Sequence, residues 1–352
     1  RILETFVQFG AHENILIESH PHIGTNKLPH IISEMRETII SAGGEVLFQS
    51  KMIDFTLNEN RIQEIQLESG VTIKGDYYVL ATGHSARDIF KLLDSKQVKI
   101  EYKPFAIGFR IEHQQLFIDQ QQYHCKIKDE NLPPASYSVV TQTDERAVYS
   151  FCMCPGGIVA PCATSPEEIV TNGWSPSKRN NEWANSGIVG EVNEADLKEY
   201  IEFGELRGLK LQEFIERKAF ILGGAEGSAP AQLAIDFIEN RESRHLKPTS
   251  YKPGISSVNL NTLFPKALAA SLRDGLIQIE KKIPGFTRNA LLIAPETRTS
   301  SPVRIPRDTS TFVHPEIKNL FPCGEGAGYA GGIISAAIDG ERVAEAIASS
   351  KC

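Results

Sequence analysis

The sequence has few cysteines, no long apolar run and no surplus of basic residues. Six cysteines in 352 residues are too few and too irregularly spaced for a disulfide scaffold, which favours a reducing, cytoplasmic compartment. No apolar run approaches the ~18 residues that a membrane span requires, so we expect no membrane partner. The 44 acidic residues outnumber the 37 basic ones, which is unlike a nucleic-acid-binding protein.

The length of the chain indicates about two domains, since a domain averages roughly 150 residues. The chain begins at Arg1 rather than at methionine. Residues 2–7 have the apolar spacing of a helix that is already under way. We therefore expect a fragment of a longer protein.

Residues 24–90 contain the clearest succession of predicted elements. A Gly-Thr-Asn capping cluster precedes a helix whose apolar residues recur on one face, and this helix ends at Gly43. The apolar run 77–81 predicts a central strand that is buried on both faces. Alternating segments before it predict further strands at residues 45–48, 52–57, 62–67 and 71–73.

The middle of the chain has a different pattern, with proline-rich joints, short strands and helical stretches at 194–217 and 229–241. The last fifty residues return to the first pattern, with a strand at 320–322 and a helix at 333–348. The expected division is a discontinuous α/β domain, residues 1–98 and 303–352, with an inserted α+β domain, residues 99–302.

A glycine cluster separates this last strand from the last helix. Gly326, Gly328 and Gly331 have the spacing G-x-G-x-x-G, and glycines before a helix let backbone N–H groups approach a phosphate. The dinucleotide fingerprint also needs a second strand and an acidic residue about 20 positions further on, and neither follows here. We therefore expect this element to complete a sheet begun elsewhere. The alternative is a tight turn that packs Gly340 against the sheet.

Thr82 and Gly83 end the buried strand at 77–81, where α/β sheets place their ligands. The sequence Gly-His-Ser-Ala-Arg from Gly83 is similar to the nucleophile elbow of hydrolases. That motif requires glycine at the position of Arg87, so we do not expect a hydrolase.

These features together resemble the FAD-dependent dehydrogenase family of bacteria and plastids, within the glutathione-reductase-like class of flavoproteins. The resemblance spans nearly the whole chain, but the family's N-terminal G-x-G-x-x-G loop and the acidic residue after it are absent. It implies a three-layer FAD/NAD(P)-binding-type domain that is incomplete at its N-terminal side. The motifs that carry it are residues 20–25 (HPHIGT), 154–157 (CPGG), 170–175 (VTNGWS), 184–186 (ANS), 296–304 (ETRTSSPVR) and 324–332.

The resemblance also assigns roles to individual residues. Residues 324–328 would contact the ribityl and pyrophosphate part of FAD, with Glu325 where the wider class often has Asp, and the next helix would present N–H groups to the flavin pyrimidine edge. The backbone of Met52 would pair with adenine, although an ordinary core methionine is the alternative. The cofactor-binding candidates are Met52, Thr82, Gly83, Gly324, Glu325, Gly326, Ala327, Gly328, Gly331, Gly332 and Ile333.

Arg298, Arg304 and His22 are the catalytic candidates. The two guanidinium groups could clamp a substrate carboxylate or a nicotinamide cofactor phosphate. The alternative is that both arginines satisfy Glu296 and loop carbonyls.

Two other groups of residues are weaker candidates. His20, His22 and His30 lack a completing ligand set, so no metal site is expected. Cys152 and Cys154 lack the C-x-x-C spacing, so we expect a structural role, with a redox disulfide as the alternative.

The function that the resemblance implies is an FAD-dependent oxidoreductase of dehydrogenase type that acts on a small-molecule substrate, with NAD(P)H as a candidate electron donor. The alternatives are a non-catalytic FAD- or nucleotide-binding protein whose inserted domain recognises a partner, and a flavin-dependent enzyme that modifies RNA. Without the N-terminal phosphate loop we expect this fragment to lack bound FAD. Its unpaired sheet edge favours a homodimer or another contact that covers the edge.

Overall fold

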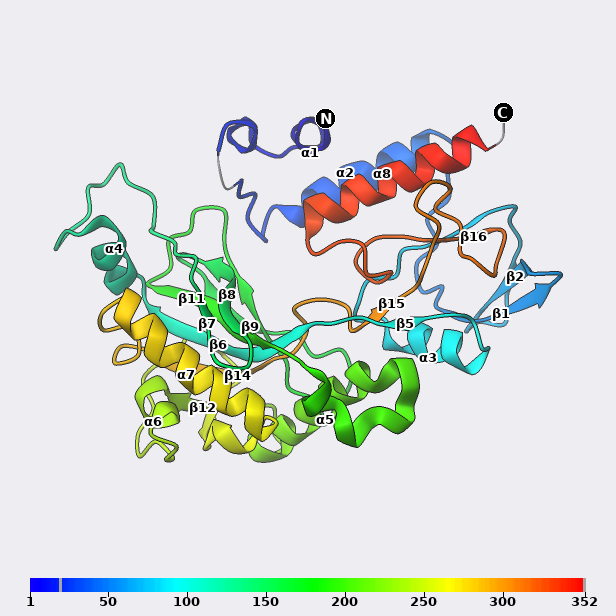
Figure 1. The fold of residues 1–352 in the computed structure, drawn as a ribbon. Helices are drawn as coiled ribbons and strands as arrows, with labels where there is room; N and C mark the ends of the chain where they lie inside the picture. The colour runs from blue at the N-terminus through cyan, green and yellow to red at the C-terminus, as the bar shows by residue number, and fades with distance from the viewer. Residues whose placement is uncertain (19–20, 351–352) are drawn as a thin grey trace.

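The structure is a computed structural model that describes residues 1–18 and 21–350. Figure 1 shows two bodies, one around a large sheet and one around smaller sheets and two long helices. The fold is mixed α/β, as the sequence predicts. Within the described residues, no helix combines the length and the apolar character needed to cross a membrane.

The larger body is built on a seven-stranded mixed sheet with the strand order β13-β12-β14-β6-β11-β8-β7. One face packs on helices, and Phe109 of the central strand β6 meets Phe237 there with ring centroids 5.2 Å apart. The strands are β6 (Ala106–Gln114), β7 (Val140–Gln142), β8 (Ala147–Cys154), β11 (Trp183–Glu191), β12 (Ala229–Leu233), β13 (Ile255–Ser257) and β14 (Leu291–Glu296). The helical segments are α4 (Gln115–Tyr123), η2 (Glu194–Leu206), α5 (Arg207–Leu222), α6 (Ala234–Ile238), η3 (Leu260–Thr262) and α7 (Lys266–Lys282).

The opposite face of this sheet is covered by a hairpin of β9 (Ile158–Pro161) and β10 (Thr171–Trp174). A Cβ atom at Gly173 would overlap the guanidinium of Arg110 from β6 and the thiol of Cys154 from β8. Only glycine therefore allows the hairpin to approach the sheet this closely.

The smaller body joins segments from both ends of the chain. Strand β4 (Tyr78–Leu80) pairs in parallel with β16 (Leu320–Pro322), although some 240 residues lie between them. Beside this pair lies an antiparallel meander of β1 (Met52–Asn58), β2 (Arg61–Leu67) and β3 (Thr72–Ile73). The other elements are α1 (Ile2–Gln8), η1 (Glu13–Leu16), α2 (Leu28–Ser41), α3 (Arg87–Ser95), β5 (Glu101–Tyr102), β15 (Val303–Arg304) and α8 (Ile333–Ser349).

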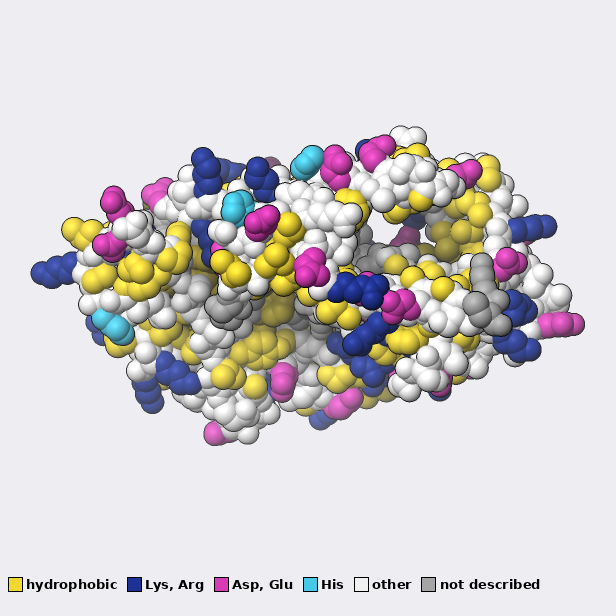
Figure 2. All heavy atoms as spheres, turned by 90° about the horizontal axis from the view of Figure 1, so that it is seen from above, with side chains coloured by type: hydrophobic (Ala, Val, Ile, Leu, Met, Phe, Trp, Pro, Cys, Tyr) yellow, Lys and Arg dark blue, Asp and Glu magenta, His cyan; other side chains and the backbone are white. Residues whose placement is uncertain are grey.

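Helices α2 and α8 both lie along the top of the smaller body (Figure 1). Ile31 of α2 is fully buried, and Phe6 of α1 and Ile334 of α8 belong to the same apolar cluster. Figure 2 shows this face from above, hollowed and with hydrophobic side chains around the hollow.

The structure corrects four details of the sequence prediction. Residues 45–48 form no strand, and Phe48 is exposed. Strand β4 has β16 as its neighbour and leaves Val79 49% exposed, so the prediction that it is buried on both faces is wrong.

The other two corrections concern predicted helices of the larger body. Residues 229–233 form a strand and not a helix, because their backbone pairs with β13 on one side and with β14 on the other. The predicted helix 194–217 is divided at Gly204, whose φ of 55° and ψ of −124° are not helical.

The loop after β16 is anchored to helix α8 by Asp339. This carboxylate accepts hydrogen bonds from the Gly324 N–H at 2.7 Å and from both terminal nitrogens of Arg307, at 2.9 and 2.5 Å. Burial raises the pKa of Asp339, but Arg307 and the Gly324 N–H outweigh it and hold the pKa below its ordinary value. The folded state therefore binds the ionised form more strongly than the unfolded chain does.

We predict that Asp339→Asn lowers the free energy of unfolding by about 3–5 kcal/mol at pH 7, because Arg307 would remain buried without its counter-charge. Wild-type stability is also expected to fall as the pH drops below about 4, through the lowered pKa of Asp339, and the variant should lose less over that range. Urea unfolding at pH 7 and pH 3 measures both effects. Glu345→Ala, an exposed acidic position on the same helix, is the control, and equal losses in the two variants would contradict the prediction.

Candidate functional site

The parallel strands β4 and β16 deliver two glycine-containing loops to the same edge. A Cβ atom at Gly326 would lie 2.5 Å from the carbonyl oxygen of Gly83, so the two backbones touch. We call Gly83, Gly324, Gly326 and Gly328 the glycine junction. It lies at the carboxyl ends of the parallel strands, where open α/β sheets bind ligands.

The backbone at the glycine junction is unfavourable for other residues. Gly83, Gly324 and Gly328 have φ values of +75°, +75° and +84°. At Gly83 and Gly324, nothing lies within 4 Å of the position that a Cβ atom would take. The Gly83 position is therefore open to an incoming group, whereas Gly324 is buried, its N–H donates to Asp339 and its carbonyl accepts from the Tyr329 N–H.

Three side chains place charge at the glycine junction. A Cβ atom at Gly328 would lie 3.0 Å from the side chain of Lys103 and 3.3 Å from Cα of Arg304. Burial, assisted by the positive charge of Arg304, lowers the pKa of Lys103, and Glu325 opposes the shift. The Nε atom of Arg304 is buried and has no hydrogen-bond partner, and its guanidinium lies 5.4 Å from the Tyr329 ring centroid. The single negative charge of Glu325 therefore offsets only part of the positive charge of Lys103 and Arg304.

The two loops are also joined by side chains. Nδ1 of His84 lies 3.4 Å from the Glu325 carboxylate, across the contact between Gly83 and Gly326. On the other side, the N–H of Ile305 donates to the carbonyl of Ala327 at 3.2 Å, which ties the glycine loop to the segment that carries Arg304.

The remaining cofactor candidates lie around the junction in different environments. Gly331 and Gly332 precede α8 and have open space where a Cβ atom would stand, and Ile333 is 54% exposed. Thr82 is exposed. Met52 begins β1 and packs against the apolar cluster that also contains Ala327.

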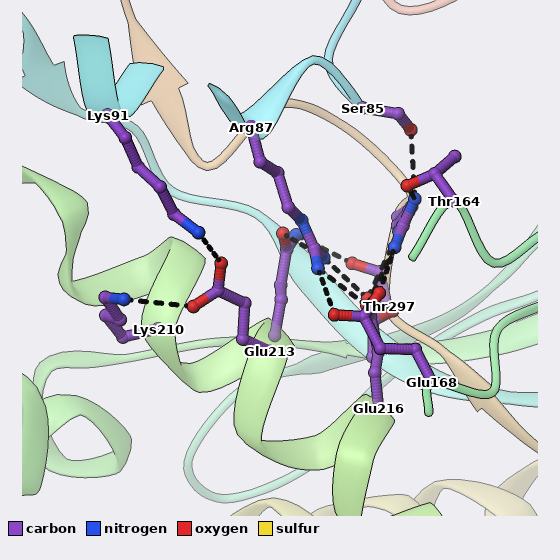
Figure 3. A network of polar contacts seen from close by, with 11 residues as sticks. Ser85, Arg87, Lys91, Thr164, Glu168, Lys210, Glu213, Glu216 and Thr297 are labelled. Atoms are coloured by element: carbon purple, nitrogen blue, oxygen red, sulfur yellow. Dashed lines mark hydrogen bonds and ion pairs between the residues drawn. The ribbon is translucent and has the colours of Figure 1, made fainter. Parts of the chain in front are cut away.

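Arg298 lies in a different place, where it forms ion pairs with the buried carboxylates of Glu168 and Glu216. Figure 3 shows Arg87, Glu168 and Glu216 of this network. Glu216 of α5 receives two hydrogen bonds from Arg87, at 2.8 and 2.7 Å, and two from Arg298, at 3.2 and 2.8 Å. Arg298 also donates to Glu168 at 3.2 Å, to Thr164 at 2.7 Å and to Ser85 at 3.4 Å.

This geometry corrects the prediction that Arg298 and Arg304 form one clamp. The five donors of the Arg298 guanidinium are matched by five hydrogen bonds, so none is left for a substrate carboxylate. The alternative, in which Arg298 and Arg304 satisfy Glu296, is also wrong about the partner. Glu296 pairs instead with Arg110, whose Nε lies 3.0 Å from the Glu296 carboxylate. Arg304 remains at the glycine junction, and the two arginines act in separate environments.

His22 joins neither arginine through its described contacts. Its Nε2 lies 3.0 Å from the Pro176 carbonyl oxygen, and burial lowers its pKa. His20 lies outside the described residues, and among those described no cluster of three His, Cys, Asp or Glu residues could hold a metal ion. The contact with the Pro176 carbonyl, two residues after strand β10, explains the position of His22 as a structural one.

Lys103, Glu216 and the role of Arg87 are not predicted by the sequence patterns described above. Arg87 was noted only as a reason to exclude a hydrolase, yet it is 6% exposed and opens α3. A signal for Glu216 exists in its position on the mainly apolar buried face of α5, which it shares with Gln212, because a buried carboxylate needs a partner. Nothing in the local sequence identifies that partner.

The structure is thus a mixed α/β protein in which two parallel strands bring the glycine junction, two cations and one carboxylate to one edge of a sheet. Residues 104–299 match the family described as "FAD-dependent protein, C-terminal domain-like", and the chain belongs to this family. An uncharacterised protein of Clostridium beijerinckii is 40% identical over 351 residues, which is 98% of this chain and 65% of that protein. The chain thus spans less than two thirds of the length of this relative.

Solved structures show weaker similarity. A salicylate hydroxylase substrate complex is 11% identical over 85% of this chain and 50% of that chain, with a TM-score of 0.32. The flavin-dependent halogenase BrvH from Brevundimonas sp. BAL3 is 11% identical over 46% of this chain and 25% of its own, with a TM-score of 0.24. Both scores are low, so neither similarity bears on the reaction of this chain.

We predict that Arg298→Ala lowers the free energy of unfolding by about 3–5 kcal/mol, because Glu216 and Glu168 would share a single buried counter-charge. The control is Lys210→Ala, which removes a half-buried cation that pairs with Glu213 on the same helix α5, and it should cost less than about 1 kcal/mol. Urea unfolding midpoints measure both. Unchanged stability combined with lost turnover in Arg298→Ala would restore the catalytic assignment.

Proposed function

We propose that this protein is an FAD-dependent oxidoreductase of dehydrogenase type and that the glycine junction holds part of its FAD. The observation that carries the proposal is the contact of Gly83 with Gly326 beside Lys103 and Arg304. Two glycine loops in contact and two cations at parallel strand ends suit a pyrophosphate. Membership of an FAD-dependent family supports this choice of cofactor.

The residues present fit such a group. Positions 83 and 324 leave open space in place of a Cβ atom, and the unpartnered Nε of Arg304 is a buried donor without an acceptor. A buried donor of this kind is destabilising unless an acceptor reaches it. A phosphate oxygen at the junction supplies that acceptor.

The proposed roles of the other candidates follow from their positions. Gly331 and Gly332 precede the 17-residue helix α8, which begins at Ile333, and the Gly331 N–H donates to Ser335 Oγ. The positive end of this helix favours the negative charge that a reduced flavin gathers on its ring. Met52 is proposed to meet adenine through its backbone. FAD supplies hydride and electron transfer, and the protein contributes binding, orientation and electrostatics.

Lys103 is proposed to serve binding rather than proton transfer. Its pKa is lowered because burial and Arg304 both disfavour its charge, and an anion at the junction would reverse that shift. Cofactor binding and protonation of Lys103 are therefore expected to support each other. NAD(P)H as electron donor and a small-molecule substrate belong to the same proposal.

We predict that Arg304→Ala weakens FAD binding by about 10-fold to 150-fold, because a hydrogen bond to a charged group contributes about 1.5–3 kcal/mol. Quenching of flavin fluorescence on titration with protein measures the dissociation constant. Lys99→Ala removes an exposed cation that pairs with Glu101 and serves as the control. Equal affinities of Arg304→Ala and wild type would remove Arg304 from the cofactor site.

We predict that the chain of 352 residues purifies without stoichiometric FAD. No segment of the sequence combines a strand, a G-x-G-x-x-G loop, a helix and a later acidic residue. In a complete dinucleotide-binding site, such a loop would contribute about two or three hydrogen bonds to the pyrophosphate. Their absence weakens binding by about 3–9 kcal/mol, enough for the cofactor to wash away. Absorbance in the flavin band tests this, and a stoichiometric yellow cofactor would show that the junction alone suffices.

A further inference from the structure

A second polar cluster lies in the larger body, between the seven-stranded sheet and the hairpin β9–β10. Arg110 of β6 is completely buried, and its Nε lies 3.0 Å from the Glu296 carboxylate of β14. Its terminal nitrogens donate to the carbonyl of Cys152 at 3.0 Å and to the Asn172 side chain at 3.2 Å. The flavin function proposed above uses none of these groups.

Cys152 and Cys154 lie beside this arginine at the end of β8. Cys152 is exposed and has a φ of +46°, and the pairing of β8 with β11 is irregular there, as in a β-bulge. Cys154 is buried and donates from its thiol to the Cys152 carbonyl at 3.5 Å. Residues two apart in an extended strand are about 6.6 Å apart at Cα, close to the upper limit for a disulfide, and a bulge shortens that span.

Asn185 provides an independent sign that this cluster receives a polar group. It is completely buried, and both its side-chain oxygen and its nitrogen lack a hydrogen-bond partner. Its Cα is paired with that of Cys154 across the antiparallel strands, which places the two side chains on the same face, with Cβ atoms about 5 Å apart. A buried amide next to a thiol is satisfied only when an oxygen or a water enters.

We propose that Cys152 and Cys154 are a redox-active thiol pair, in which a hydroperoxide oxidises exposed Cys152 and buried Cys154 closes the disulfide. The inference does not depend on FAD, because every group it uses belongs to the larger body. It replaces the expectation of a purely structural Cys-x-Cys strand.

The reaction balances with a hydroperoxide as the oxidant. The Cys152 thiolate attacks one peroxide oxygen, the O–O bond breaks, and the sulfur becomes a sulfenic acid while the other oxygen leaves as hydroxide or alkoxide. The Cys154 sulfur then attacks the sulfenic sulfur, the S–S bond forms, and the sulfenic oxygen leaves as water with the Cys154 proton. Two thiols are oxidised and one peroxide is reduced.

The electrostatics favour Cys152 as the attacked thiol. The hydrogen bond from Cys154 and the charge of Arg110 outweigh burial and lower the pKa of Cys152 to about 6. A thiol with a lowered pKa carries more thiolate at pH 7 than an ordinary cysteine does, and the thiolate is the nucleophile. The same hydrogen bond and burial raise the pKa of Cys154, as expected for the thiol that acts second.

The test treats the reduced, flavin-free protein with hydrogen peroxide and maps its peptides by mass spectrometry. We expect the peptide with Cys152 and Cys154 to lose two hydrogens as an internal disulfide. In Cys154→Ser, dimedone should trap a sulfenic acid at Cys152. Cys125→Ser, which removes a cysteine outside the cluster, should leave both results unchanged. No disulfide in wild type, or no trapped Cys152 in Cys154→Ser, overturns the proposal.

Alkylation with iodoacetamide across a pH series gives a second readout that requires no oxidation. Cys152 should label with a midpoint near pH 6, and Cys154→Ala should raise that midpoint because it removes the hydrogen bond from Cys154. Cys162 is the internal control, since burial raises its pKa to about 11. A Cys152 midpoint above pH 8 would show an ordinary thiol and overturn the proposal.

Discussion

The position of Glu216 between Arg87 and Arg298 constrains both bodies of this protein. Glu216 comes from helix α5, Arg87 opens α3 of the smaller body, and Arg298 follows the large sheet. Because all three side chains are buried, none can leave the network without a large desolvation penalty for the others. The loop that carries Gly83 lies only four residues before Arg87, so this ion network fixes one half of the glycine junction relative to the large sheet.

The network stabilises a particular arrangement more clearly than it stabilises folding. Burial raises the pKa of Glu216, but its hydrogen bonds and charges from both arginines leave the pKa below its ordinary value. For Glu168, burial and the nearby Glu216 outweigh the same arginines and raise the pKa. One carboxylate is therefore well matched and the other less so. Such a cluster contributes little net stability compared with an apolar core, but wrong dockings of α3 on α5 leave unpaired buried charge.

Local patterns predicted the elements that depend on near neighbours. Helices α2 and α8 and strands β1 and β2 follow from periodicity and capping, whereas the union of the first and last segments of the chain in one domain came from the family resemblance. The strand at residues 229–233 was not predicted, because its apolar pattern is also compatible with a helix and only the pairing with β13 and β14 decides between the two. The partner of Arg87 lies 129 residues away, and no periodicity reports a contact of that range.

Three consecutive residues connect the two polar regions of the molecule. Glu296 pairs with Arg110 beneath the hairpin, and Thr297 and Arg298 both donate to Glu216. Arg298 in turn reaches Ser85, two residues after Gly83. Burial raises the pKa of Glu296 to about 7, with the Cys152 charge adding to the shift and Arg110 opposing it. Residues 296–298 therefore link the cluster around Arg110 and Cys152 to the ion network of Glu216, and through Arg298 to the loop that carries Gly83.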